Sequence, residues 1–426
     1  MKKGKIKENG RQLLLFFQIH QPARLLTYDA SEKSDTTEYF DRELDKTILQ
    51  KIAIDGYILA NKLLFKLIGQ YPQLKIAFSI SGTALEQMQR YTPEVIASFR
   101  ELVDTGAIEI FSQPYYNSFP FLLNSDEMEA QILLHAEKVY ECFGVRPSAF
   151  INTQLFYNND IGKRIAMMGY HSIITEGSNE VLQGNLPHSL YRHVDDKSFK
   201  IITRNPDLSN DLAFHVRKME WGLSPEKYMS WLDSIPKEQS LVTIGVPYDA
   251  LRTDEDGGTT TIDFLESLLL LLAMQQNYKM ILPSEVGQAS KNLKPLSVIE
   301  YQGTKGCPLS MWLGNERQKE AFAALSELED RVKASGKSDL LEYWRYLQSV
   351  DHFLYMSDDP AFSTFASPQL AFEQYMRTIS SLRDQLAQAT SQKTEEQINA
   401  AVEAERREIK EPTWAMAMDH NHGQPH

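Results

Sequence analysis

The chain has 426 residues, of which 42% are hydrophobic, and this is enough to form the core of one large α/β domain together with a smaller one. The 57 Asp and Glu residues outnumber the 44 Lys and Arg residues, which gives a formal net charge of -13. This charge argues against nucleic acid as a partner, because phosphate-binding surfaces are basic, but it is compatible with a neutral ligand such as a sugar.

The cysteines and the N-terminal segment indicate the compartment. Two cysteines, Cys142 and Cys307, cannot build a disulfide framework, so free thiols in a reducing environment are expected. The apolar run 13–17 is too short for a signal peptide, and no segment approaches the roughly 18 apolar residues that cross a bilayer. We therefore expect a cytoplasmic protein that makes no contact with a membrane.

Short β-rich runs alternate with longer helical segments along most of the chain. The runs are 13–19, 74–80, 107–112, 148–152, 171–175, 199–203 and 241–246. The helical segments include 44–70, 84–104, 125–142, 159–168 and 262–275. Strands that alternate with helices are typical of parallel βα units, and this number is one short of a complete barrel. The pattern predicts an α/β fold in which residues 1–300 form an incomplete TIM-type (β/α)7 barrel.

The strand pattern stops at about residue 300. Amphipathic periodicity continues in 315–335, 339–356 and 367–389, which predicts three helices. We expect residues 301–391 to form a C-terminal α-helical bundle domain. Residues 392–426 are polar and charged, and they are expected to form a helical or disordered tail.

Polar and aromatic side chains follow the predicted strands. They include "HQPAR" (20–24), "QPYYNSF" (113–119), "TQLFYNND" (153–160) and "PYDALRTDEDGG" (247–258). In a parallel barrel the active site forms at the carboxyl ends of the strands, so these segments would meet at one rim. Aromatic rings stack on sugar rings and amides bind hydroxyl groups, so the mixture is typical of a carbohydrate site.

Five segments, in order along the chain, resemble glycoside hydrolase family 57 and its α-amylase subgroup. They are "HQPARL" (20–25), "SISGTALEQM" (79–88), the segment 151–177 that begins "INTQLFYNND", "MWLGNERQKEAFAALSELE" (311–329) and "WRYLQSVDHFLYM" (344–356). The resemblance implies the incomplete (β/α)7 barrel with a helical C-terminal domain. It also implies action on α-1,4-glucans with retention of anomeric configuration.

The sequence departs from the family at the catalytic positions. The glutamate nucleophile of the family's Asn-Thr-Glu motif is replaced by Gln154, and the aspartate general acid after the seventh strand is replaced by Pro247. In the third-strand motif, Gln113 and Asn117 replace an acid and a histidine. Retaining hydrolysis needs two carboxyl groups about 5–5.5 Å apart, and neither an amide nor a proline supplies one. No catalytic carboxylate is therefore expected to be intact.

Neighbouring acids are possible substitutes. Asp249 lies two residues beyond the acid position, so on an extended strand it would point to the same side as Pro247, about 6–7 Å away. Glu176 follows the fifth predicted strand. The run with Asp254, Glu255 and Asp256 is expected to be a solvated loop, because its acids are consecutive and do not alternate as in a calcium loop.

The candidate substrate-binding residues lie in the segments that carry the resemblance or follow the strands. They are His20, Gln21, Arg24, Gln113, Tyr115, Tyr116, Asn117, Gln154, Trp221, Tyr248, Trp312, Asp351 and His352. Structural roles are the alternatives: a core histidine, an ion pair for the arginine, packing for the rings and a helix cap for Asp351. No cofactor or metal site is expected, since the spacing of His188 and His193 matches no common ligand pair.

Three functions remain open at this point. The first is a non-catalytic pseudoenzyme that binds an α-1,4-glucan or maltooligosaccharide in glycogen- or starch-type metabolism, in association with glucan-metabolising enzymes. The second is an active hydrolase or glucanotransferase that uses displaced acids, with Asp249 as the first choice. The third is a structural or interaction protein that keeps only the fold.

Overall fold

The computed structural model describes residues 10–27, 38–123, 125–216, 222–252, 260–275, 277–287, 292–359 and 367–391. Trp221, the acidic run with Asp254, Glu255 and Asp256, and the tail 392–426 lie outside these ranges. The expectations for those residues stay predictions.

Seven strands follow one another around a barrel, and they coincide with the seven predicted runs. They are β1 (Arg11–Ile19), β2 (Ile76–Ile80), β3 (Ile108–Ile110), β4 (Ala149–Ile151), β5 (Ser172–Glu176), β7 (Lys200–Arg204) and β8 (Leu241–Pro247). One parallel sheet has the order β3-β2-β1-β8, and β4, β5 and β7 are parallel neighbours in the other. This confirms the (β/α)7 fold class.

Two short contacts join the sheets into a ring. After β3, Ser112 forms a parallel bridge with Phe150 of β4. On the other side, the amide N–H of Asn205, directly after β7, donates to the carbonyl of Thr243 in β8 at 2.7 Å. The carboxyl ends of the seven strands therefore lie at one rim.

Three further short strands were not expected from the sequence. β6 (Leu190–His193) is antiparallel to β7 and extends that sheet, and β10 (Lys294–Leu296) pairs with β6. β9 (Tyr278–Met280) pairs with the first residues of β1. β3 and β4 are equally short, but the missed strands read Leu-Tyr-Arg-His, Tyr-Lys-Met and Lys-Pro-Leu, and a basic residue or a proline interrupts the apolar pattern in each.

Alternation along β1 separates the two faces of the barrel wall. Leu13, Leu15 and Phe17 belong to the core between the barrel and the helices, while Leu14 and Phe16 belong to the core inside the barrel. This follows from the two-residue period of a strand. The same alternation turns Gln18 inward near the carboxyl end, where the apolar interior gives way to a cavity.

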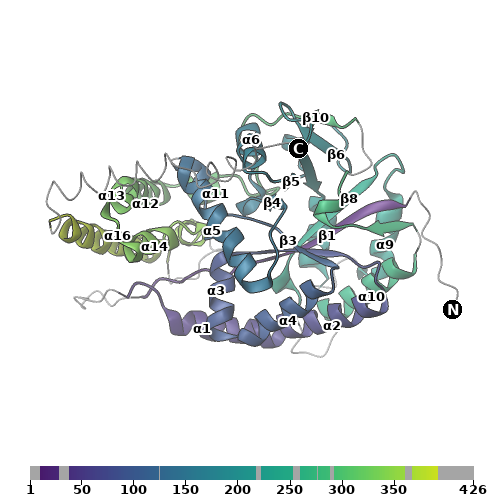
Figure 1. The fold of residues 1–426 in the computed structure, drawn as a ribbon, viewed down its shortest axis with the longest axis horizontal. Coiled ribbons are helices and arrows are strands. Elements are labelled where there is room, and N and C mark those ends of the chain that lie inside the picture. The colour runs from purple at the N-terminus through teal and green to yellow at the C-terminus, as the bar shows by residue number, and fades with distance from the viewer. Residues whose placement is uncertain are drawn as a thin grey trace, which may run out of the picture.

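Helices cover the outside of the barrel (Figure 1). They are α1 (Arg42–Ile52), α2 (Ile58–Gln70), α3 (Gly82–Tyr91), α4 (Pro93–Asp104), α5 (Ser125–Phe143), α6 (Asn159–Met167), α7 (Asn179–Leu182), α8 (Pro206–Asn210), α9 (Pro225–Ser234) and α10 (Thr261–Met274). The predicted helix 84–104 is two helices, because Pro93 has no N–H to donate to a preceding turn and begins α4 instead.

The C-terminal part contains six helices among the described residues, where three were expected. They are α11 (Ser310–Leu313), α12 (Glu316–Ser326), α13 (Glu329–Ser335), α14 (Ser338–Tyr346), α15 (Val350–Leu354) and α16 (Pro368–Ser391). Figure 1 places α12, α13, α14 and α16 together at one end of the molecule. Their buried residues, such as Trp344 and Tyr375, share a core with Phe119 and Phe156 of the barrel loops. The boundary of a separate domain at residue 300 stays a prediction.

None of the helices in the described ranges has both the length and the apolar composition needed to cross a membrane.

Gly245 in β8 offers a test of the barrel packing. A Cβ at this position would overlap the ring of Phe16, whereas a Cβ at Gly69 near the end of α2 would meet no atom within 4 Å. We expect Gly245→Ala to lower the free energy of unfolding by about 1–3 kcal/mol, the usual cost of overpacking a core. Gly69→Ala should be neutral or stabilising by up to about 1 kcal/mol. Urea unfolding of both variants measures this, and equal stabilities would contradict the packing described.

Candidate active site

A cavity of about 400 Å³ opens at the carboxyl ends of the barrel strands; we call it the barrel cavity. Its wall contains seven of the residues singled out in the sequence: His20, Gln113, Asn117, Gln154, Pro247, Asp249 and Asp351. These residues come from the ends of β1, β3, β4 and β8 and from α15. The fold therefore gathers them at one site although they are spread over more than 300 positions of the chain.

Gln154 occupies a strained turn after β4. Its φ is 53° and that of Leu155 is 58°, in the left-handed region that side chains other than glycine rarely adopt. Its carbonyl accepts hydrogen bonds from the N–H and the hydroxyl of Thr304, both at 2.9 Å. Such backbone strain costs about 1–3 kcal/mol per residue and persists where the surroundings fix it, often at a ligand site. The segment around Thr304 supplies that restraint here.

Pro247 is the last residue of β8, and the chain turns directly after it. Residues 248–250 form a 3-10 turn, so the expectation that Asp249 continues the strand is wrong. Asp249 nevertheless lines the barrel cavity. It reaches the cavity because of the turn and not because of strand alternation.

Asp249 is held by two polar side chains. The hydroxyl of Tyr57 donates to one carboxyl oxygen, and the amide of Gln21 donates to the other at 3.3 Å. Burial raises the pKa of Asp249 above its usual range, and this outweighs the opposite effects of Tyr57, Arg252 and His20. The protonated form is therefore favoured relative to an exposed aspartate.

His20 links the barrel to α15. Its Nδ1 lies 2.8 Å from Ser81 Oγ, and its Nε2 lies 2.8 Å from Asp351 Oδ2, which also accepts from Ser349 at 2.8 Å. Burial alone would raise the pKa of Asp351, but His20 and the Ser349 hydroxyl hold it below its usual range. The carboxylate of Asp351 is thus ionised and bound to His20 and Ser349.

The order Ser81, His20, Asp351 has the composition of a nucleophilic triad, but its geometry does not fit one. Ser81 is fully buried, lies outside the cavity wall and accepts the N–H of Ala84 as the cap of α3. A nucleophile must reach a bound substrate. We therefore assign these hydrogen bonds to positioning of the His20 ring.

Glu176 is fully buried and does not line the barrel cavity. One of its oxygens pairs with the Arg204 guanidinium at 2.8 Å and accepts the N–H of Lys305 at 3.1 Å. Arg204 and Lys305 both line the cavity. The carboxylate of Glu176 is therefore paired with Arg204 outside the cavity wall, and the ammonium group of Lys305 is paired with Asp207 at 2.8 Å.

The third-strand segment contributes two amides to the wall. The hydroxyl of Ser79 donates to the side-chain oxygen of Gln113. Asn117 has a φ of 51°, which asparagine tolerates better than most residues, and its carbonyl accepts the N–H of Val350 at 3.1 Å. Asn117 thus connects the barrel rim to the helix that carries Asp351.

Several predicted rim aromatics are placed in the protein core instead. Tyr248 is fully buried among the rings of Phe17 and Phe78, and its hydroxyl donates to Asn61 at 2.6 Å. Trp312 is buried against phenylalanine rings of the second core. Neither ring lines the barrel cavity, so neither has a face available for stacking there.

The remaining predicted residues lie around the cavity and not in its wall. Tyr115 and Tyr116 are buried with their rings 4.7 Å apart, and Arg24 forms an ion pair with Asp45 at 2.8 Å. His352 is buried beside the ring of Tyr375, and burial lowers its pKa to about 4. Gln21 touches the site only through Asp249.

Phe214 is a wall residue that sequence reasoning missed. It lies in the π-helical segment Asp211–His215 after α8, its side chain is 54% exposed, and it lines the barrel cavity. An exposed ring at a polar cavity is a stacking surface for a sugar. No sequence pattern marked it, because it follows the strand by ten positions. Thr304, Lys305 and Cys307 were also missed, since they follow no ring strand.

No group of three or more His, Cys, Asp or Glu side chains in the described ranges is arranged to hold a metal ion.

Known proteins resemble this chain in sequence and in fold. A proposed alpha-amylase of Methanocaldococcus jannaschii is 29% identical over 389 residues, which cover 85% of this chain and 82% of that protein. The branching enzyme of Pyrococcus horikoshii superposes with a TM-score of 0.68 at 14% identity, covering 93% of this chain and 94% of its own.

The 4-alpha-glucanotransferase of Thermococcus litoralis superposes with a TM-score of 0.65 at 12% identity. The match covers 91% of this chain but only 60% of that longer protein. At these identities the structures support the fold alone. Residues 14–301 match the sequence model of glycosyl hydrolase family 57, so the chain belongs to this family.

Proposed function

We propose that this family 57 protein binds an α-glucan in the barrel cavity without cleaving it. Gln154 and Pro247 both line this cavity, and the family resemblance assigns them to the positions of the nucleophile and the general acid. A glutamine keeps the shape of glutamate and its hydrogen bonds to hydroxyls, but it carries no charge and forms no glycosyl ester. Double displacement then has no standard route.

The charges of the wall favour the same conclusion. Glycoside cleavage passes through a transition state that resembles an oxocarbenium ion and therefore carries positive charge. Carboxylates stabilise this charge, but both wall carboxylates, Asp249 and Asp351, are engaged by other side chains. The wall cations Arg204 and Lys305 are themselves paired with Glu176 and Asp207. Both cations can still donate hydrogen bonds to the hydroxyls of a bound sugar.

Binding is supported by the remaining wall. The side chains of Gln18, Gln113 and Asn117 and the ring of Phe214 line one cavity. Amides bind hydroxyls, and an exposed ring covers an apolar sugar face. The names of a 4-alpha-glucanotransferase and a branching enzyme among the similar structures favour an α-glucan as the ligand. A cytoplasmic location and association with glucan-metabolising enzymes complete the proposal.

A displaced acid at Asp249 is the second candidate. It lines the cavity, and its raised pKa is the property that a general acid needs near neutral pH. Two observations count against it. Its oxygens are engaged by Tyr57 and Gln21, and the other wall carboxylate, Asp351, is engaged by His20 and Ser349.

The first prediction is the absence of turnover. Purified protein should release no reducing sugar from starch, glycogen or maltoheptaose above background, because the residues at both catalytic positions lack a carboxyl group. Chromatographic detection of products over a day measures this. Steady cleavage that disappears in Asp249→Asn would establish the displaced-acid mechanism instead.

The second prediction concerns affinity. Maltoheptaose should bind with a Kd on the order of 10⁻⁵ to 10⁻³ M, as expected for one stacked ring and several hydrogen bonds. Phe214→Ala should weaken binding by about tenfold, or about 1.4 kcal/mol. Phe65→Ala is the matched control, since this ring in α2 is 48% exposed and outside the barrel cavity. Calorimetry that finds no heat with millimolar sugar and folded protein would favour a protein that keeps only the fold.

The third prediction tests the environment of Asp249 through pH. Because its pKa is raised on folding, the folded protein retains a proton that the unfolded chain loses. The stabilisation is therefore complete below the usual aspartate pKa and is lost as pH rises through the raised value. Asp249→Asn should remove this decline, which begins as pH rises above the usual aspartate pKa. Urea unfolding measures the profile, with the exposed Asp330→Asn as control; parallel slopes for wild type and Asp249→Asn would contradict the buried carboxyl.

A further inference from the structure

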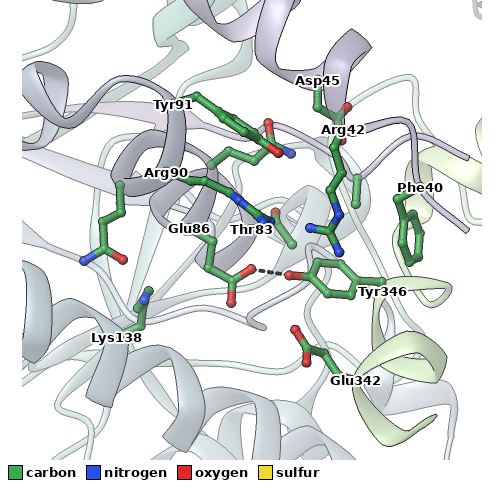
Figure 2. Close-up of a pocket in the computed structure, with 13 residues that line it drawn as sticks. Phe40, Arg42, Asp45, Thr83, Glu86, Arg90, Tyr91, Lys138, Glu342 and Tyr346 are labelled. Carbon is green, nitrogen blue, oxygen red and sulfur yellow. Dashed lines mark hydrogen bonds between the residues drawn. The ribbon is translucent and has the colours of Figure 1, made fainter. Parts of the chain in front are cut away.

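A second cavity of about 450 Å³ lies between α3, α14 and the start of α1; we call it the junction cavity (Figure 2). It has no lining residue in common with the barrel cavity. Its volume is within the range of small-ligand sites, about 300–1,000 Å³. Neither the family membership nor the reaction chemistry gives it a role.

The charged side chains of the wall cancel one another. The wall has three basic residues, Arg42, Arg90 and Lys138, and three acidic residues, Asp45, Glu86 and Glu342, so its formal charges sum to zero. Three of them also pair with residues outside the wall: Asp45 with Arg24, Arg42 with Glu38 and Lys138 with Glu141. A site for an anion or a cation would have an excess of the opposite sign. The balance favours a neutral ligand that both donates and accepts hydrogen bonds.

Glu86 presents fixed acceptor atoms to this cavity. The hydroxyls of Tyr115 and Tyr346 each donate a hydrogen bond to one of its oxygens. The bond from Tyr346 is the dashed line in Figure 2. Among the described residues, Glu86 forms no ion pair within 4.0 Å. Each carboxylate oxygen has a second lone pair, so Glu86 can accept further hydrogen bonds from a ligand.

Gln87 indicates independently that the junction cavity lacks a hydrogen-bond donor. Its side chain is only 8% exposed and lines the junction cavity, and its amide N–H group donates to the carbonyl of Pro22 at 2.9 Å. Its carbonyl oxygen has no hydrogen-bond partner in the described part of the chain. A buried unpaired acceptor costs about 1–3 kcal/mol, which a ligand hydroxyl or a water would relieve.

Aromatic rings complete the wall. Tyr346, Tyr91 and Phe40 line the cavity, and Figure 2 shows Arg42 pointing toward Tyr346. Arg90 lies over the ring of Tyr91 at 5.8 Å from its centroid. Ring faces beside charged groups of both signs match a sugar, which has apolar faces and a rim of hydroxyls.

We propose that the junction cavity is a second carbohydrate-binding site, for a short neutral oligosaccharide. Because Glu86 is in α3 and Tyr346 is in α14, a sugar bound there would contact both the barrel and the C-terminal helices. The inference goes beyond the proposed function and does not require a glucan in the barrel cavity.

Hydrogen exchange with maltotriose as the probe tests the site and locates it. We expect slower exchange in 82–91 and 338–346, and an affinity at least about fivefold weaker in the double variant Arg90→Ala, Glu342→Ala. Both of these side chains are exposed, so the fold should survive. The matched control is Arg146→Ala, Glu137→Ala, which removes an exposed ion pair elsewhere and should leave the affinity unchanged.

The remaining outcomes distinguish binding in the junction cavity from binding in the barrel cavity. Slower exchange only at the barrel rim, near residues 153–155 and 247–250, would overturn the junction site and leave the barrel site standing. Slower exchange only in α3 and α14 would support the junction site and contradict binding in the barrel cavity. If free lysine slows exchange in α3 and α14 and maltotriose does not, the ligand is a zwitterion and the proposal of a neutral oligosaccharide is wrong. If the double variant fails to fold, Gln89→Trp, which fills the cavity from α3, replaces it; undiminished protection there would overturn the proposal.

Discussion

The pairing of β1 with its neighbours is the constraint on which the rest of the structure depends. β1 is hydrogen-bonded to β8 along most of its length, and to β9 and β2 on its other side. The register places Gln18 opposite Pro247 and carries the chain into His20 at the rim. A shift of β1 by one residue would turn Leu14 and Phe16 outward and remove Gln18 from the cavity.

The barrel cavity has a rigid polar frame around the positions that the family resemblance assigns to catalysis. His20 is fixed between Ser81 and Asp351, and Gln154 is held in a strained turn by Thr304. The left-handed backbone at Gln154 and Leu155 costs free energy, and such strain is often found at ligand sites. A polar, rigid cavity without a nucleophile is what sugar binding without cleavage requires.

Much of the barrel could be predicted from the sequence because its strands are apolar runs bounded by polar turns. β6, β9 and β10 could not, since a basic residue or a proline interrupts the apolar pattern in each of them. Tyr248 illustrates a different limit. It follows Val242, Ile244 and Val246 at a spacing of two, and this alternation indicates the outward core more reliably than its position beside the rim. The contact between His20 and Asp351, 331 positions apart, was within reach only through the family resemblance.

The most direct test of the account is the structure of the protein with maltoheptaose at neutral pH. The account predicts an intact saccharide in the barrel cavity, stacked on Phe214, with the Gln154 amide bonded to a hydroxyl and no carboxyl group within hydrogen-bond distance of a glycosidic oxygen. Cleaved sugar in the cavity, or a glycosidic oxygen hydrogen-bonded to Asp249, would contradict it.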